Sequence, residues 1–421
     1  MSNPYEVYGI SDKTAEIADS AMKAVLPVFA QIDRLREINE LRVLDAFRRH
    51  KFSDTHLGST TGYGYDDMGR EKLEAIFADL FGAEAAYVRM QISSGTQAIS
   101  SMLYGVLRPG DKMLSVTGRP YDTLMQTIGI GDDITYDATL KDYGVSYDEV
   151  ELLPDGSPDL KAIEDKLDLS TKMVFIQKSR GYSSRRALLI KDIEAVVKVV
   201  RNWSEKNNHP VIVAVDNCYG EFTEEKEPCA VGADICGGSL IKNAGGGYCP
   251  TGGYVVGRAD LVEKVAQRIT APGLGSHVGP TLGFNRMLAR GLFTAPSCVA
   301  ECLKGAVFTA KILEMTGLNV SPRFDEARGD IVQTITFNDG DKLVKFCQMI
   351  QQCSPVDSFV TPEPYDMPGY DDLVIMAAGA FVQGATTELS CDGPMREPYI
   401  AYMQGGLIYE QAKLASMLVI N

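Results

Sequence analysis

Lys242 is the residue of this sequence that most suggests covalent chemistry. It follows the apolar segment Ile235–Ser239 and precedes the glycine run 245–247. Burial at the end of a strand favours the neutral form of a lysine, and the neutral amine is a nucleophile that bonds to carbonyl carbons. A nucleotide site is not indicated, because no G-x-G-x-x-G follows a strand and G-x-x-x-x-G-K-[S/T] is absent. We therefore predict an amine nucleophile with a lowered pKa.

Asp216 ends a second apolar segment, Val211–Val215. Ligands of open α/β sheets bind beyond the carboxyl ends of the strands, so Asp216 is expected to face a ligand. A carboxylate there can pair with a protonated ring nitrogen and keep a pyridine ring cationic. Tyr219, three residues further on, can donate its hydroxyl to a phenolic oxygen of the same ring. The alternative for Asp216 is an aspartate that starts a turn.

The segment SSGTQA, residues 93–98, lies between an expected strand and an expected helix. Its small residues let the backbone approach a ligand, and a helix N-terminus offers N–H groups and a positive dipole end to a phosphate. The alternative is that Ser94 only caps the helix. The residues expected to contact a phosphate are Ser94, Gly95, Thr96, Gln97 and Ser239.

Strand and helix patterns alternate from residue 59 to 293, which predicts a mostly parallel sheet with helices on both faces. A helical segment, 1–58, precedes this large domain, and a smaller α+β domain, 294–421, follows it. The segment Tyr399–Leu418 is predicted to be helical. The expected strands of the large domain are Ala86–Met90, Lys112–Thr117, Met173–Gln177, Val211–Val215, Ile235–Ser239 and Tyr254–Gly257.

Composition restricts the partners of this protein. Its formal net charge of −15 disfavours nucleic acid and anionic lipid. No apolar run approaches the ~18 residues of a membrane span, and the N-terminus lacks the pattern of a secretory signal. The nine cysteines form no C-x-x-C pair and the four histidines are far apart, so we expect free thiols and no metal. A cytoplasmic protein is predicted.

These segments resemble the fold-type-I pyridoxal-phosphate (PLP) enzymes of the cystathionine and methionine lyase group. The chain is similar to the bacterial methionine gamma-lyase family, whose members are also known as aluminium-resistance proteins and cystathionine beta-lyases. The resemblance covers residues 61–407, most of the chain. Its segments are TGYGYDDMGR, VRMQISSGTQAI, DNCYGEF, VGADICGGSLIKNAGGG, TGGYVVG and ELSCDGPMREPYIAYMQGGL.

The resemblance implies an aspartate-aminotransferase-like fold with a seven-stranded sheet. It implies that Lys242 holds PLP and later moves the Cα proton, and that Asp216 binds the ring nitrogen. Gly95, Thr96 and Ser239 would hold the phosphate. Tyr121 occupies the position of the aromatic ring that stacks on the cofactor, and its alternative is a turn tyrosine.

Two further implications concern the substrate and a neighbouring subunit. Arg396 lies where this group has the arginine that binds the substrate α-carboxylate, with a surface arginine as the alternative. Arg180 is placed near either the phenolic oxygen of the cofactor or the carboxylate of the substrate. Tyr63 and Tyr65 lie in the loop that reaches the neighbouring subunit's cofactor in relatives. The usual pattern there is Tyr-x-Arg, and Tyr65 replaces the arginine, so Arg70 is the candidate substitute.

The implied activity is a PLP-dependent carbon–sulfur lyase that acts on a sulfur amino acid by α,β- or α,γ-elimination. The group also implies a homo-oligomer, a dimer or tetramer, with shared active sites. Two alternatives stay open. One is a PLP-dependent aminotransferase or aldolase, and the other is a non-catalytic PLP-binding protein with a role in stress tolerance.

Overall fold

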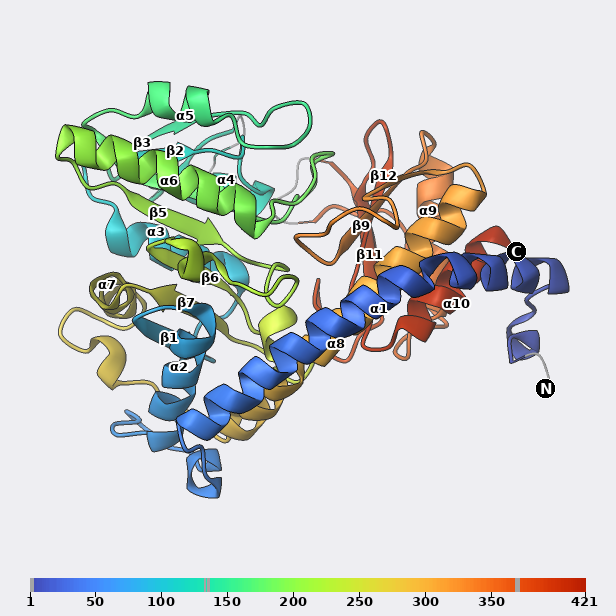
Figure 1. Ribbon diagram of the computed structural model, residues 1–421, viewed down its shortest axis with the longest axis horizontal. Helices are drawn as coiled ribbons and strands as arrows, with labels where there is room; N and C mark the ends of the chain where they lie inside the picture. Colours follow the sequence, from blue (N-terminus) through green and yellow to red (C-terminus); the bar gives the residue numbers. More distant parts are fainter. Residues whose placement is uncertain (1–3, 132–133, 135–136, 368–371) are drawn as a thin grey trace.

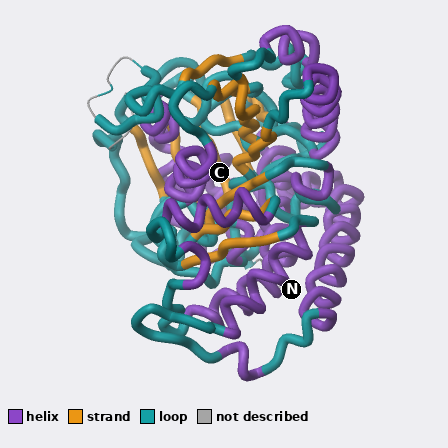
Figure 2. Tube along the Cα trace, turned by 90° about the vertical axis from the view of Figure 1, so that its left-hand side faces the viewer, coloured by secondary structure: helices purple, strands orange, loops and turns teal. Residues whose placement is uncertain are grey.

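The protein contains one large and one small β-sheet (Figure 1). The structure is a computed structural model that describes residues 4–131, 134, 137–367 and 372–421. None of the helices in these ranges is long and apolar enough to cross a membrane. In Figure 2 the strands lie in the interior and helices and loops surround them.

The large sheet has seven strands in the order β1-β7-β6-β5-β4-β2-β3. All neighbours are parallel except β7, which is antiparallel to both β1 and β6. The predicted mostly parallel, seven-stranded sheet is therefore confirmed, whereas β3 was not expected from the sequence. The strands are β1 (Ala85–Arg89), β2 (Lys112–Ser115), β3 (Ser146–Glu149), β4 (Thr171–Gln177), β5 (Ile212–Asp216), β6 (Ile235–Ser239) and β7 (Gly253–Gly257).

Both faces of this sheet are buried beneath helices. Met173 and Phe175 of β4 belong to one apolar cluster, while Val174 and Ile176 belong to another. Alternate residues of a strand point to opposite faces, so the two clusters lie on opposite sides of the sheet. The helices of this part are α2 (Met68–Phe81), α3 (Gly95–Val106), α4 (Asp122–Ile128), α5 (Leu160–Lys166), α6 (Ile190–Asn207) and α7 (Ala259–Ile269).

The small sheet is antiparallel and has the order β10-β11-β12-β9-β8. The helix predicted for Tyr399–Leu418 is wrong in its first part, because residues 400–404 pair with strands on both sides. Gly405 and Gly406 then turn the chain with positive φ before α10 begins. The elements are β8 (Asn319–Ser321), β9 (Val332–Thr336), α9 (Gly340–Gln352), β10 (Val374–Ala377), β11 (Ser390–Pro394), β12 (Ile400–Gln404) and α10 (Tyr409–Ile420).

Two long helices connect the two sheets. Helix α1 (Asp12–Arg49) packs against α8 (Phe284–Met315), and Figure 1 shows the pair running from the large sheet towards the small one. Helix α1 begins earlier than the pattern from Ala21 indicated, because the Ser11 side chain caps it by accepting the Thr14 N–H. The domain boundary expected at residue 293 falls within α8, and the division into domains stays a prediction.

Asp67 fastens the loop before α2 to the segment before α8. Its carboxylate caps α2 by accepting the Arg70 N–H at 2.9 Å, and it also accepts the hydroxyls of Thr60 and Thr281 and the amide of Asn285. Burial opposes the charge, but the hydrogen bonds from Thr281, Thr60, Arg70 and Asn285 lower the pKa of Asp67. The ionised carboxylate is thus part of the folded structure.

We expect Asp67→Ala to lower the free energy of unfolding by about 1–3 kcal/mol at pH 7, because it removes a helix cap and leaves buried donors without an acceptor. A group whose pKa is depressed by folding stabilises the protein above its unfolded pKa. The difference from wild type should therefore shrink below about pH 4. Chemical denaturation measures it, with Glu71→Ala on the exposed face of α2 as control. Equal stability of the two variants would show that Asp67 does not have this role.

Candidate active site

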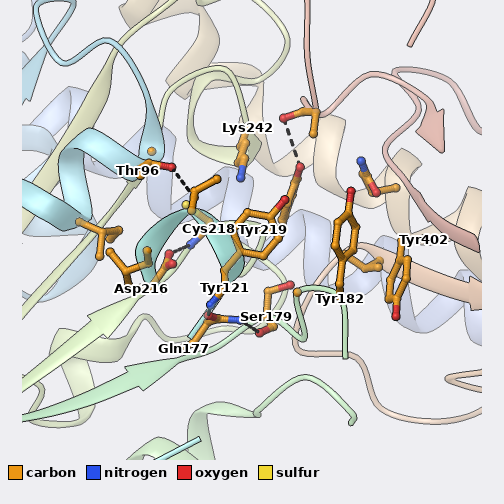
Figure 3. A pocket seen from close by; sticks show the side chains of 18 of the residues that line it. Thr96, Tyr121, Gln177, Ser179, Tyr182, Asp216, Cys218, Tyr219, Lys242 and Tyr402 are labelled. Atoms are coloured by element: carbon orange, nitrogen blue, oxygen red, sulfur yellow. Dashed lines mark hydrogen bonds between the residues drawn. The ribbon is translucent and has the colours of Figure 1, made fainter. Parts of the chain in front are cut away.

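The largest set of predicted residues meets in a pocket between the two sheets. The empty volume of the pocket is about 790 Å³, and its walls include Gln177 at the end of β4 and Asp216 at the end of β5. These two residues are paired in register, so the parallel strands bring both side chains to one sheet edge. Figure 3 shows Thr96 and Asp216 at one end of the pocket and Tyr182 and Tyr402 at the other, with Lys242 between them.

Lys242 lies in the pocket three residues beyond the end of β6. Its Nζ is 4.0 Å from the ring centroid of Tyr219. The predicted lowering of its pKa is wrong in this state of the pocket. Burial does disfavour the charge, but the negative potential of Cys218, Tyr219 and Asp216 outweighs burial and raises the pKa of the Lys242 amine. The amine is therefore held protonated until the charge around it changes.

Asp216 provides the negative charge at one end of the pocket. Burial raises its pKa, while the Cys218 N–H, which donates to Oδ1 at 3.0 Å, and the charge of Lys242 oppose this effect. A carboxyl group in such a setting gains most from a further cation close by, because a neighbouring positive charge favours ionisation. This is the setting expected of a partner for a protonated ring nitrogen.

The N-terminus of α3 forms the wall next to Asp216. Gly95 and Thr96 line the pocket, and their contact with a phosphate stays a prediction. Ser94 caps α3 by accepting the Gln97 N–H at 3.0 Å, so the structure shows the capping role that was its alternative. Gln97 also uses its side chain locally, because its Oε1 accepts from the backbone and hydroxyl of Ser93. Neither residue is among those that line the pocket.

Ser239 lies directly behind Gly95. Its hydroxyl is buried and has no hydrogen-bond partner among the described residues. A Cβ at position 95 would lie 3.2 Å from the Ser239 Cβ and 3.1 Å from the Cys218 Sγ, so a side chain there would crowd both. Glycine at position 95 thus lets the first turn of α3, which lines the pocket, lie close to the Ser239 hydroxyl, although Ser239 itself is not among the residues that line the pocket. A helix N-terminus with a hydroxyl close to it suits a phosphate.

Tyrosine rings form much of the remaining wall. The backbone N–H of Tyr121 donates to Gln177 Oε1 at 2.7 Å, and its ring lies 5.6 Å from the ring of Tyr182. Tyr219 has a positive φ of 67°, and its hydroxyl donates to the carbonyl of Ala385 at 3.1 Å. That hydroxyl, predicted to bind a phenolic oxygen, is therefore bonded to backbone in this state.

The two predicted arginines do not line the pocket. Arg396 is 2.9 Å from Asp372, and its side chain is 47% exposed. Arg180 is buried, and its Nη1 donates to the Ser321 carbonyl and to the Thr334 hydroxyl, each at 3.1 Å. Its Nε and Nη2 are buried and have no partner within the described parts of the chain. One edge of the Arg180 guanidinium is thus unused.

The loop expected to reach another subunit lies on the surface. Tyr63 and Tyr65 are exposed, and their rings stack with centroids 5.5 Å apart. Arg70 is buried and donates to the carbonyls of Gly64 and Gly279, so it supports this loop from below. None of the three side chains is part of the pocket wall in a single chain.

Sequence reasoning missed several residues of the pocket wall. Gln177 and Ser179 follow β4, and the rule that pointed to Asp216 at the end of β5 would also have found Gln177. Asp392, Tyr402 and Gln404 come from strands of the small sheet that were not predicted. Their place in the pocket depends on strand pairing, which no local signal reveals. The missed residues are Gln177, Ser179, Tyr182, Cys218, Asp392, Tyr402 and Gln404.

Comparison with known proteins places the chain in a family. The protein YnbB of Bacillus subtilis is 50% identical over 390 residues, which cover 92% of this chain and 91% of that protein. The crystal structure of a carbon-sulfur lyase involved in aluminium resistance from Clostridium novyi NT superposes with a TM-score of 0.94 at 47% identity. It covers 99% of this chain and 97% of its own.

A more distant likeness supports the fold. The crystal structure of the pyridoxal-5'-phosphate dependent protein YhfS from Escherichia coli has a TM-score of 0.59 at 18% identity, over 92% of this chain and 96% of its own. The fold is therefore that of fold-type-I PLP enzymes, as predicted. The sequence model of the methionine gamma-lyase family matches residues 14–421. With half of its sequence identical to YnbB and nearly its whole length matched by that model, this chain belongs to the methionine gamma-lyase family.

Proposed function

We propose that this protein is a PLP-dependent carbon–sulfur lyase that releases a thiol from a sulfur amino acid. The observation that carries the proposal is the meeting of Lys242 and Asp216 in one pocket, at the strand ends of a chain of this family. The solved structure from Clostridium novyi NT, described as a carbon-sulfur lyase, supports the same class of reaction.

The residues of the pocket fit PLP. The Ser239 hydroxyl, which has no partner among the described residues, and the N-terminus of α3 suit the phosphate, and the half-buried carboxyl of Asp216 suits the ring nitrogen. Tyr121 offers a ring for stacking, and Lys242 offers the amine that would hold the cofactor. When bound, PLP supplies an electron sink for the Cα of an amino acid.

Each charged group then has a defined task. Asp216 would hold the proton on the ring nitrogen. Lys242 would hold the cofactor and, once released from it, accept and return the Cα proton. Because the pKa of Lys242 is raised in the pocket, the amine must give up its proton before it can bond to the cofactor. A cationic ring nitrogen bound by Asp216 would reduce the negative potential that holds that proton.

We propose that Arg180, and not Arg396, binds the substrate α-carboxylate. The Nε and Nη2 groups of a guanidinium form a two-pronged edge that matches a carboxylate, and this edge of Arg180 is unused. Tyr402 lines the pocket and lies close enough to both arginines for their charges to affect its pKa. Burial raises its pKa to about 12, and the charges of Arg396 and Arg180 oppose the rise. Arg396 already has an anionic partner in Asp372.

We also propose that two copies of the chain share their active sites. The exposed Tyr63 and Tyr65 stack on each other on the surface, and Asp67 and Arg70 hold their loop in place. A rigid, exposed aromatic pair suits contact with a second subunit.

The reaction itself is tested by incubating the PLP-saturated protein with cystathionine, cysteine, methionine and homocysteine. We expect a thiol, ammonia and either pyruvate or 2-oxobutyrate from at least one of them. Transfer of an amino group to a keto acid without release of thiol would contradict the lyase and support an aminotransferase.

Asp216→Asn should leave PLP bound but reduce turnover roughly 10²-fold or more, because an amide cannot keep the ring nitrogen protonated in a site with little water. PLP content is read from absorbance and turnover from release of 2-oxo acid. Near-normal turnover would exclude this role for Asp216.

Arg180→Lys should raise KM for amino acids by about 10-fold or more, because an ammonium group does not reproduce the planar two-bond contact. Arg396→Lys is the matched variant, and we expect a smaller effect from it. PLP affinity and melting temperature control for damage to the fold. A large rise in KM for Arg396→Lys with none for Arg180→Lys would assign the carboxylate to Arg396.

A further inference from the structure

Four residues that are paired side by side across the strands of the small sheet connect the pocket to Arg180. Asp392 of β11 is paired with Tyr402 of β12, Tyr402 with Thr334 of β9, and Thr334 with Ser321 of β8. Directly paired residues have their side chains on the same face of a sheet. Thr334 and Ser321 bind the guanidinium of Arg180, while Asp392 and Tyr402 line the pocket.

Asp392 is a buried carboxyl group that the reaction described above does not use. The residue is 5% exposed, and its Oδ1 has no hydrogen-bond partner among the described residues. Burial raises the pKa of Asp392 to about 7, against the opposing effects of the Tyr182 hydroxyl and the charge of Lys242. An unsatisfied carboxyl oxygen is costly inside a protein, so its presence at a pocket wall points to a ligand that donates to it.

Among the described residues that line the pocket, no second cation is available for Asp392. Of the described residues that line the pocket, Lys242 is the one cationic side chain, and the proposed function assigns it to the cofactor. The remaining source of a cation is the substrate. Its α-amino group reacts at the cofactor, so a cation that meets Asp392 must lie further along the substrate.

The distance between strands of the small sheet gives the length of a substrate that would reach both Arg180 and Asp392. Asp392 and Thr334 are two strands apart, which corresponds to roughly 10 Å between their backbones. A substrate whose α-carboxylate lies at Arg180, beside Thr334, would therefore extend past Tyr402 and bring the groups beyond its sulfur atom to Asp392. Figure 3 shows Tyr182 and Tyr402 side by side at this end of the pocket, and their ring centroids are 4.9 Å apart.

We propose that Asp392 binds an ammonium group on the leaving side chain of the substrate, so that the pocket selects thioethers with an amino group on each side of the sulfur. This inference rests on the proposed lyase function and on the proposed role of Arg180. It distinguishes diamino thioethers, such as cystathionine, from methionine and cysteine, which end without a cation.

Two substrates that differ only in the distal amine test this proposal. Cystathionine is compared with S-(3-carboxypropyl)cysteine, which is cystathionine without that amine, on the wild-type holoenzyme and on Asp392→Asn. A charge-assisted hydrogen bond in a buried site should give cystathionine an advantage of about 10-fold or more in kcat/KM, mainly through KM. We expect Asp392→Asn to lose this advantage, so that its kcat/KM for cystathionine falls to its own value for the analogue.

Asp341→Asn, the same change at an exposed position of α9 in the same part of the chain, is the control and should keep the preference. Asp392→Asn replaces a buried carboxyl, whose Oδ1 has no partner among the described residues, with an isosteric amide, so we expect its melting temperature to stay close to that of the wild type. Binding is measured separately, by titrating each substrate into the holoenzyme and following the absorbance of the cofactor. This readout does not depend on cleavage.

The outcomes separate this inference from the lyase proposal. If the wild type releases thiol but binds and cleaves the two substrates equally, the lyase function stands and the ammonium subsite is wrong. Equal losses for both substrates in Asp392→Asn would also overturn the subsite and indicate a proton donor to the leaving sulfur. If no thiol is released from either substrate, the lyase function fails. The subsite is then judged by whether Asp392→Asn abolishes tighter binding of cystathionine.

Discussion

The active site depends on the parallel pairing of β4, β5 and β6. Parallel strands end at the same edge of a sheet, and here that edge brings Gln177, Asp216 and Ser239 together although they are far apart in the sequence. Lys242 and the N-terminus of α3 are held beside this edge by the turns that leave β6 and enter α3. If this register slipped by one residue, Asp216 would point to the opposite face of the sheet and the pocket would lose the carboxylate at the end of β5.

A second constraint is the burial of charge. Asp216, Lys242 and Asp392 share one pocket, and burial alone would drive all three towards their neutral forms. The negative neighbours of Lys242 outweigh that effect and keep its amine protonated. The pocket is therefore built for charged ligands. A cationic ring nitrogen, a phosphate and the charged groups of an amino acid are the partners that its unpaired donors and acceptors require.

The sequence predicts those site residues that lie at the end of a strand or at the start of a helix. It does not predict the residues that reach the pocket through strand pairing. Asp216, Lys242, Gly95 and Thr96 follow apolar runs or begin helices, so local rules found them. Asp392 and Tyr402 enter the pocket through the register of the small sheet, and Tyr402 lies in a segment that was expected to be helical. The pKa direction of Lys242 was predicted wrongly because it depends on Cys218, Tyr219 and Asp216, whose positions only the fold determines.

All of these roles depend on Lys242 as the residue that would carry PLP in this pocket. The most direct measurement is reduction of the PLP-loaded protein with borohydride, which makes the bond between lysine and cofactor permanent, followed by peptide mass spectrometry. We expect the cofactor mass on the peptide that contains Lys242, and we expect it to be absent from a Lys242→Ala variant treated in the same way. Cofactor on another lysine, or on none in the saturated protein, would show that Lys242 does not carry PLP.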